Sequence, residues 1–316
     1  MEELIKMQNV VVMGECMVEF APKTESSIYK QSFAGDVYNT AVYLKRLQKN
    51  TVDVALLTAV GNDSVSDHMV DDFVNNGINI NLVKRVCDRQ PGAYLIQISN
   101  EGERSFVYWR DTSAAKVIIS QLSDHDKKKL ISQCDLFYFS GISIAILDEK
   151  ERKSFWQLVA ELRKSGTQII FDSNFRSRLW QSHDEAKQQF GKALTQSDIV
   201  FAGIEDFSLL YQLSSFSELD SFFSDCSIAE LIIKNGADGI FYRSTTEQFT
   251  VDIDPVENVI DTTSAGDAFN SGFLSARMNG FTAIDAIKQA CKLSACVIQH
   301  KGAIIDSQVF SDFIST

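Results

Sequence analysis

The chain has 316 residues, of which 45% are hydrophobic and 23% are charged, a balance typical of soluble globular proteins. Its net charge at pH 7 is −12, from 42 acidic and 30 basic residues. This charge argues against binding to nucleic acid or to an anionic membrane, because both select basic surfaces. Any anionic ligand would therefore need individually placed arginines, lysines or backbone N–H groups.

The N-terminal region carries no targeting signal that we can identify. Its only unbroken apolar run, Val10 to Met13, is too short for a signal-peptide core or a membrane span, so we expect a cytoplasmic protein. The six cysteines form no Cys-x-x-Cys pair, and the four histidines show no metal-ligand spacing. The sequence therefore predicts neither a zinc site nor a disulfide framework.

Short apolar runs alternate with amphipathic stretches along the chain. The predicted strands are residues 9–13, 52–60, 136–141, 168–172, 198–203 and 230–234. Strands without a polar face, separated by helices, are typical of a mostly parallel sheet that is flanked by helices on both faces. Because no Gly/Ser-rich or charged linker interrupts this α/β pattern, residues 1–316 are predicted to form a single domain.

Residues 93–110 break this rhythm. Two alternating runs on either side of Asn100, Glu101 and Gly102 predict a β-hairpin, which with residues 15–20 would form a small separate sheet. Ligands of open α/β folds bind beyond the carboxyl ends of the strands. The small sheet is therefore either a lid over that crevice or an edge hairpin without a role in binding.

The stretch VIDTTSAGDAFNSGF, residues 259–273, places a carboxylate where a helix is predicted to begin. Thr263 or Ser264 can cap this helix, and the N–H groups of Ala265 and Gly266 are open to an anion. A carboxylate repels a phosphate, so Asp267 fits better as a base that takes a proton from an attacking hydroxyl. The alternative is that Asp267 only stabilises the start of the helix.

Two further stretches follow predicted strands. Residues 234–239, KNGADG, can form a tight turn that brings backbone close to a nucleotide, although an ordinary hairpin turn has the same glycines. Asn174 and Arg176 follow the strand 168–172, at the end where ligands bind. Neither G-x-x-x-x-G-K-[ST] nor G-x-G-x-x-G occurs, which disfavours a P-loop enzyme and a dinucleotide-dependent oxidoreductase.

Taken together, these stretches resemble the ribokinase-like (PfkB) family of carbohydrate kinases, and within it the branch that acts on 2-keto-3-deoxygluconate. DTTSAGD matches the family signature D-T-x-G-A-G-D except at Ser264. The resemblance extends in order over nearly the whole chain, through GECMVEF, FAGDVYNTAVYL, PGAYLIQ, GERSFVYWRDTSAAK, SGISIAIL, FDSNFRSRLW and VIQHKGAII.

The resemblance implies a ribokinase-like α/β fold with a small β-sheet lid from residues 15–34 and 88–112, and an ATP-dependent transfer to the 6-hydroxyl of the sugar acid. Asp267 would be the general base, and Ala265 and Gly266 the anion hole. The family's sugar-acid site carries over onto Gly35, Asp36, Val37, Tyr38, Asn39, Tyr94, Tyr108, Trp109, Arg110, Arg176 and Asp267. Its nucleotide contacts carry over onto Asn174, Phe175, Arg176, Lys234, Asn235, Gly236, Ala237, Asp238, Gly239, Ser264, Ala265, Gly266 and Asp267.

Several expectations complete this interpretation. Arg110 suits the carboxylate of a sugar acid because a guanidinium can donate two parallel hydrogen bonds, although a surface ion pair is the commoner fate of an arginine. Mg²⁺ is expected to arrive with ATP, but the N-x-x-E motif of many relatives reads GIED at residues 203–206, which leaves the metal ligands open.

Three alternatives and an interface remain. The alternatives are a kinase for a neutral sugar such as fructose, a non-catalytic sugar-acid sensor and, third, an oxidoreductase. The outer face of the predicted hairpin, with Ile96 and Ile98 or their alternates, is expected to pair with a second subunit.

Overall fold

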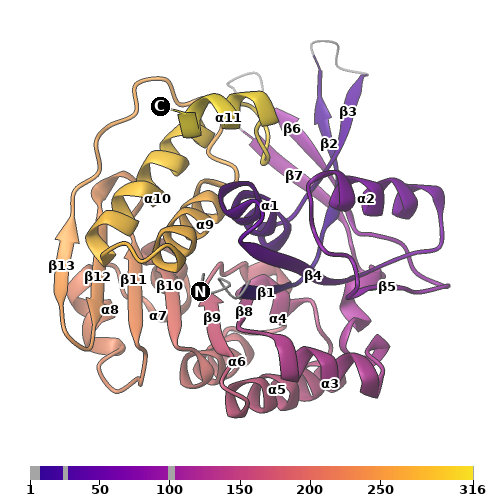
Figure 1. The fold of residues 1–316 in the computed structure, drawn as a ribbon, viewed down its shortest axis with the longest axis horizontal. Coiled ribbons are helices and arrows are strands. Elements are labelled where there is room, and N and C mark those ends of the chain that lie inside the picture. The colour runs from indigo at the N-terminus through magenta and orange to yellow at the C-terminus, as the bar shows by residue number, and fades with distance from the viewer. Residues whose placement is uncertain (1–7, 24–27, 99–103, 316) are drawn as a thin grey trace, which may run out of the picture.

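The computed structural model describes residues 8–23, 28–98 and 104–315, and its largest element is a sheet with strand order β13-β12-β11-β10-β9-β8-β1-β4-β5 (Figure 1). Its strands are β1 (Gln8–Met13), β4 (Val52–Val60), β5 (Val83–Arg85), β8 (Leu136–Ser140), β9 (Gln168–Asp172), β10 (Ile199–Gly203), β11 (Glu230–Lys234), β12 (Ile240–Ser244) and β13 (Gln248–Val251). Every pairing from β5 to β11 is parallel, whereas β12 runs antiparallel to both of its neighbours. The six predicted strands and the mostly parallel sheet are confirmed.

Helices cover both faces of this sheet (Figure 1). The first layer contains α1 (Asp36–Gln48), α2 (Ser64–Asn75), α9 (Ala265–Met278) and α10 (Ala283–Ile298), and α11 (Ser307–Ser315) packs beyond it. The second layer contains α3 (Asp124–Gln133), α4 (Gly141–Ala145), α5 (Glu149–Lys164), α6 (His183–Gln196), α7 (Ile204–Tyr211) and α8 (Phe216–Phe222). Four 3₁₀ turns are described, namely η1 (Ala114–Val117), η2 (Ile119–Gln121), η3 (Ser177–Leu179) and η4 (Gly236–Asp238).

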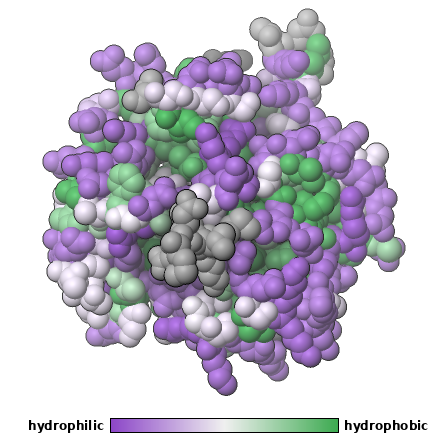
Figure 2. Space-filling view, viewed as in Figure 1, coloured by the Kyte–Doolittle hydropathy of each residue, from purple (hydrophilic) through white to green (hydrophobic). Residues whose placement is uncertain are grey.

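Strand β1 shows why this sheet needs cover on both faces. Side chains alternate across a strand, so Val10 and Val12 pack with the first layer and Val11 and Met13 with the second. Hydrophilic residues cover most of the surface seen in Figure 2, because the apolar side chains are largely used between sheet and helices. No helix within the described ranges is long and apolar enough to cross a membrane.

A second sheet of four strands, called here the small sheet, stands beside α1 (Figure 1). Its order is β3-β2-β6-β7, from β2 (Met17–Pro22), β3 (Tyr29–Ala34), β6 (Ala93–Ile98) and β7 (Arg104–Trp109). Strands β6 and β7 pair antiparallel, as predicted for the hairpin, and the predicted turn at Asn100, Glu101 and Gly102 lies outside the described residues. The separate small sheet is confirmed, and its role as a lid stays a prediction.

Candidate active site

The candidate site lies where the carboxyl ends of central strands meet the first turns of α1 and α9. Asp36, the first residue of α1, accepts hydrogen bonds from Ser140 Oγ (2.5 Å) at the end of β8 and from Asn174 Nδ2 (2.8 Å) after β9. Burial raises the pKa of the Asp36 carboxyl, and the hydrogen bond from Ser140 partly offsets this. Segments far apart in the sequence therefore converge at the carboxyl ends of the central strands, where α/β folds bind ligands.

Asp267 lies in the first turn of α9, which begins at Ala265 as predicted. Ser264 is the N-cap with a φ of 66°, a left-handed conformation that glycine adopts more easily. The Asp267 carboxylate accepts a hydrogen bond from Asn39 Nδ2 at 2.9 Å and is buried. Burial first, and then the negative charges of Asp36 and Asp172, raise its pKa to about 7. A carboxylate with this pKa can take up or release a proton near neutral pH.

Asn39 ties the two helix starts together. Its Oδ1 accepts a hydrogen bond from the Gly35 N–H (3.4 Å) while its amide nitrogen donates to Asp267. Helix α1 begins at Asp36, so Asn39 lies in its first helical turn. A Cβ on Gly35 would lie 2.3 Å from the carbonyl oxygen of Glu15. Only glycine therefore allows this close approach of the two backbones.

Lys234 brings a positive charge to this group of carboxylates. It is the last residue of β11, and its Nζ lies 3.1 Å from Asp172 Oδ1 and 3.0 Å from Asn270 Oδ1. A Cβ on Gly266 would lie 3.6 Å from the same Nζ, so the ammonium group stands beside the first turn of α9. The Ala265 N–H, expected to be open, donates instead to the Thr262 carbonyl oxygen at 3.2 Å, so the ammonium and the Gly266 N–H are the groups suited to phosphate oxygens.

The remaining residues of KNGADG form the connection between β11 and β12. Gly236 and Gly239 have φ values of 53° and 117°, which other residues rarely adopt, and η4 lies between the two antiparallel strands. The stretch is thus a hairpin turn, one of the two forms expected. Contact of its members Asn235, Ala237 and Asp238 with a nucleotide stays a prediction.

The loop after β9 is fastened by Asp206. This carboxylate accepts hydrogen bonds from the Phe175 N–H (2.9 Å) and from Ser173 Oγ, and burial first, followed by the charge of Asp172, raises its pKa to about 6. Phe175 is only 1% exposed and packs against Phe190, so its ring points into the core. The Arg176 side chain, in contrast, is 58% exposed, with Nη1 at 3.9 Å from Asp206.

These bonds bear on the metal expected with a nucleotide. Both oxygens of Asp206, the acid of the GIED stretch, already accept one hydrogen bond each, and these bonds hold the carboxylate against the loop after β9. In the described part of the chain, no group of three or more His, Cys, Asp or Glu residues is placed to hold a metal ion.

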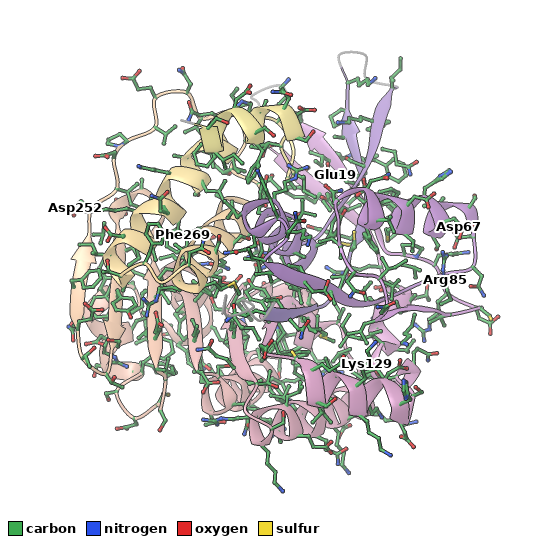
Figure 3. All side chains as sticks on the ribbon, viewed as in Figure 1. Glu19, Asp67, Arg85, Lys129, Asp252 and Phe269 are labelled. Carbon is green, nitrogen blue, oxygen red and sulfur yellow. The ribbon has the colours of Figure 1, made fainter. Side chains whose placement is uncertain are left out.

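The inner face of the small sheet carries the residues expected to bind the sugar. Arg110 forms an ion pair with Glu15, and their side chains are 11% and 1% exposed, so this is not the surface pair considered as the alternative. Tyr94 donates its hydroxyl hydrogen to Glu19, which belongs to β2 of the small sheet and is labelled in Figure 3. Burial raises the pKa of Asp36, and the charge of Arg110 slightly opposes this rise, so the two parts of the site are electrostatically coupled.

Some predicted site residues are not brought together with the others. Val37 and Tyr38 are fully buried in the core, and the Tyr38 hydroxyl donates to Asp72 at 2.5 Å. Because side chains alternate along β7, Trp109 lies on the opposite face from Tyr108 and is 57% exposed. Ile96, expected on the outer face, is 7% exposed and packs on the inner one, so its alternates face outward.

Sequence reasoning also missed several residues of the site. They are Glu15, Glu19, Ser140, Asp172, Asn270 and, on η3, Arg178. For two of them a signal was present: Ser140 and Asp172 stand at or next to the end of a predicted strand, where ligands of α/β folds bind. The others contact the site only through pairings between segments far apart in the sequence.

Comparison with known proteins agrees with this geometry. A family model described as "pfkB family carbohydrate kinase" matches residues 7–309. The chain is 36% identical over 303 residues to a 2-dehydro-3-deoxygluconokinase of Dickeya dadantii and 35% identical over 303 residues to that of Escherichia coli K12; each alignment covers 94% of this chain and 97% of the relative. A solved 2-dehydro-3-deoxygluconokinase from Thermotoga maritima is similar in fold, with a TM-score of 0.82 at 17% identity over 98% of both chains.

Proposed function

From the premise that the chain belongs to the pfkB family of carbohydrate kinases, we propose that it transfers the γ-phosphoryl group of ATP to the 6-hydroxyl of 2-dehydro-3-deoxygluconate, also called 2-keto-3-deoxygluconate. The observation that carries this proposal is the buried Asp267, which Asn39 holds in the first turn of α9 beside the Gly266 N–H. The identity of the sugar acid is inferred from the named relatives, and the reaction type is inferred from the geometry of the site.

The proposed reaction begins with proton transfer. Asp267 accepts the proton of the sugar hydroxyl as the hydroxyl oxygen attacks the γ-phosphorus, and the bond from that phosphorus to the bridging oxygen of ADP breaks. The Gly266 N–H and the ammonium of Lys234 hold the negative charge on the phosphoryl oxygens, and the Ala265 N–H would join them by giving up its bond to the Thr262 carbonyl. A pKa near 7 leaves enough Asp267 ionised to act as the base.

Mg²⁺ would be carried by the ATP phosphates, where it neutralises charge that develops on the transferring group. Because the Asp206 oxygens accept hydrogen bonds from Ser173 and Phe175, we assign this residue to holding the loop after β9. Three segments are predicted to contact the nucleotide. They are the loop after β9 (residues 174–176), the turn between β11 and β12 (residues 234–239) and the start of α9 (residues 264–267).

The decisive experiment measures ATP consumption with a panel of sugar acids and neutral sugars. We expect 2-keto-3-deoxygluconate to be used with a far higher kcat/KM than fructose, because two arginines stand at the inner face of the small sheet. Preference for a neutral sugar would favour the fructokinase alternative. Binding of the acid without ATP consumption would favour a non-catalytic sensor. The presence of Asp267 argues against a sensor, because a sensor needs no general base.

We further propose that residues 1–316 act as one domain with the small sheet as its lid, and that two subunits pair through the sheet's outer face. Val107 and Trp109 support this, since both are apolar and more than a third exposed there. Light scattering after gel filtration would test the pairing. The six free cysteines suit the reducing cytoplasm, where ATP is available, and we place the reaction there.

A further inference from the structure

A chain of buried polar groups runs beneath the candidate active site and ends at the Lys234 ammonium. The Tyr138 hydroxyl on β8 accepts a hydrogen bond from Asn270 Nδ2 on α9 at 2.9 Å, and Asn270 Oδ1 accepts one from Lys234 Nζ at 3.0 Å. Tyr138 is 2% exposed and Asn270 is 0% exposed, so solvent has little access to these bonds. A core tyrosine is thus connected to a cation of the site through one amide.

The Tyr138 hydroxyl determines which way the Asn270 amide faces. An amide carries an acceptor oxygen at one end and a donor nitrogen at the other, whereas a lysine ammonium only donates. With the amide nitrogen bonded to the Tyr138 oxygen, the amide oxygen faces Lys234. A reversed amide would set its own hydrogens against the ammonium and would weaken the hold on the lysine.

Tyr138 is suited to this task because it stays neutral. Burial first, and then the charges of Asp172 and Asp267, raise the pKa of its hydroxyl. A neutral hydroxyl accepts from Asn270 and keeps its own hydrogen for the Thr40 hydroxyl on α1, which lies within hydrogen-bonding distance. The tyrosine oxygen is therefore fixed from two helices of the first layer.

Lys234 needs such an anchor, because its ammonium is a point charge on a flexible stem. Asp172 Oδ1 and Asn270 Oδ1 accept two of its three hydrogens, at 3.1 and 3.0 Å. Among the described residues these are its two acceptors, and the ammonium stands beside the Gly266 turn. The third hydrogen is left for a ligand, and its direction depends on both acceptors staying in place.

We propose that Tyr138 is a positioning residue for phosphoryl transfer: its hydroxyl orients the Asn270 amide, and this amide holds the Lys234 ammonium where it meets the phosphoryl oxygens. The inference rests on the proposed function and extends it to a residue outside the sites predicted above. Tyr138 acts only through Asn270 and Lys234, because its ring packs in the core between the large sheet and the first helix layer.

A purely structural role makes a different prediction. Removing the hydroxyl leaves the Asn270 amide nitrogen without its acceptor, so Tyr138→Phe should lower the Tm in either case. If the hydroxyl only stabilises the fold, its removal has the same effect on ligand binding whether or not Lys234 is present. A positioning role requires that the effect on binding disappear once the ammonium is absent, and a double-mutant cycle measures this difference.

The test is isothermal titration of a non-hydrolysable ATP analogue, and separately of adenosine, into the whole protein without sugar. The variants are Tyr138→Phe, Lys234→Met and the double variant. We expect Tyr138→Phe to weaken binding of the analogue about 3- to 10-fold, the scale of one hydrogen bond, and less than about 1.5-fold in the Lys234→Met background. Adenosine has no phosphate, so its binding should stay unchanged.

Two further variants serve as control and replicate. Tyr242→Phe is the matched control, because Tyr242 is a buried tyrosine of the same sheet whose hydroxyl bonds to Glu230 instead, and it should bind the analogue like the wild type. Asn270→Ala removes the middle of the chain and repeats the cycle with Lys234→Met independently, with a loss at least as large as that of Tyr138→Phe. Thermal unfolding shows that each variant is folded at the temperature of the titration.

Kinetics provide a second readout. Tyr138→Phe should lower kcat about 3- to 30-fold and leave KM for 2-keto-3-deoxygluconate within about twofold, because the sugar site is untouched. Additive losses in either cycle, equal weakening for the analogue and adenosine, or a wild-type protein that binds no analogue would each overturn the inference. If the coupling appears in analogue binding but the wild type consumes no ATP, the proposed reaction fails and the role of Tyr138 in holding Lys234 stands.

Discussion

The two parts of the site differ in net charge and in burial. At the carboxyl end of the large sheet stand four aspartates with one lysine, and at the small sheet two arginines stand with two glutamates and two tyrosines. The aspartates are Asp36, Asp172, Asp206 and Asp267. Asp267 is 8% exposed, whereas Tyr108 is 40% exposed. A base needs burial and like charges to raise its pKa, and an anionic substrate needs accessible cations, so one surface does not serve both purposes.

The strongest way to break this comparison is to remove the base. We expect Asp267→Asn to lower kcat by about 10²- to 10⁴-fold, with little change in KM, because the amide keeps the shape and loses the proton acceptor. Steady-state kinetics with 2-keto-3-deoxygluconate would measure this. Turnover equal to that of the wild type would remove Asp267 from the mechanism.

The same variant has an opposite effect on stability, and the sign follows from the pKa. Burial raises the pKa of Asp267 in the folded state to about 7, above about 3.9 when unfolded, so the fold is favoured while the carboxyl is protonated and loses that contribution as pH rises through 7. Asp267→Asn should therefore stabilise the fold at pH 8 by at most about 4 kcal/mol and have little effect at pH 4. Urea unfolding at both pH values would check this, and a gain larger at pH 4 would contradict the raised pKa.

The effect of Lys234 on the carboxylates at the large sheet can be tested by substitution. Replacing it by Met leaves the charge of Asp172 uncompensated, which raises the pKa of Asp267 further and moves the acidic limb of the kcat/KM profile to higher pH. Turnover at high pH should also fall, by about 10- to 100-fold, because a cation at the phosphoryl oxygens is lost. Lys234→Arg keeps the charge and serves as the control. An acidic limb that does not move in Lys234→Met would show that Asp172 and Asp267 are not coupled.

The tight join between α1 and the start of the small sheet should be sensitive to a single methyl group. Gly35→Ala places a Cβ at 2.3 Å from a backbone oxygen and should destabilise the fold by about 1–3 kcal/mol. Gly191→Ala is the matched control, because a Cβ at that helical glycine would have nothing within 4 Å. This substitution should stabilise the fold by about 0.5–1 kcal/mol. Thermal unfolding of both variants would show whether the close approach or glycine loss itself is responsible.

The smallest effect is expected from a pair of neighbours on β7. Tyr108→Ala removes the ring beside Arg110 and Arg178 and should raise KM for the acid about 3- to 30-fold. Trp109→Ala, on the opposite face, should change KM less than twofold. Similar changes in both variants would mean that the two faces of the small sheet do not differ in substrate binding.

Local sequence patterns predicted most of the strands and helix starts discussed above. The β-branched runs predicted six parallel strands, and the spacing of small residues after Ser264 predicted the start of α9. The start of α1 depends on tertiary contacts, because Asp36 accepts a hydrogen bond from Ser140 at the end of β8 and Val37 packs against Gly14. Tyr38 was assigned to the site by position in a motif, but its ring is needed in the core beside Phe73.

What the sequence determined by itself is the α/β order, the small sheet and the place of Asp267 in a first helical turn, because periodicity and turn chemistry act over a few residues. Only the tertiary structure decided that Asn39 holds Asp267, that Lys234 meets Asp172, and that Arg110 is already paired with Glu15. The bonded pairs among them are 62 to 228 residues apart in the sequence. They depend on strand order, and local patterns do not specify which strand ends become neighbours.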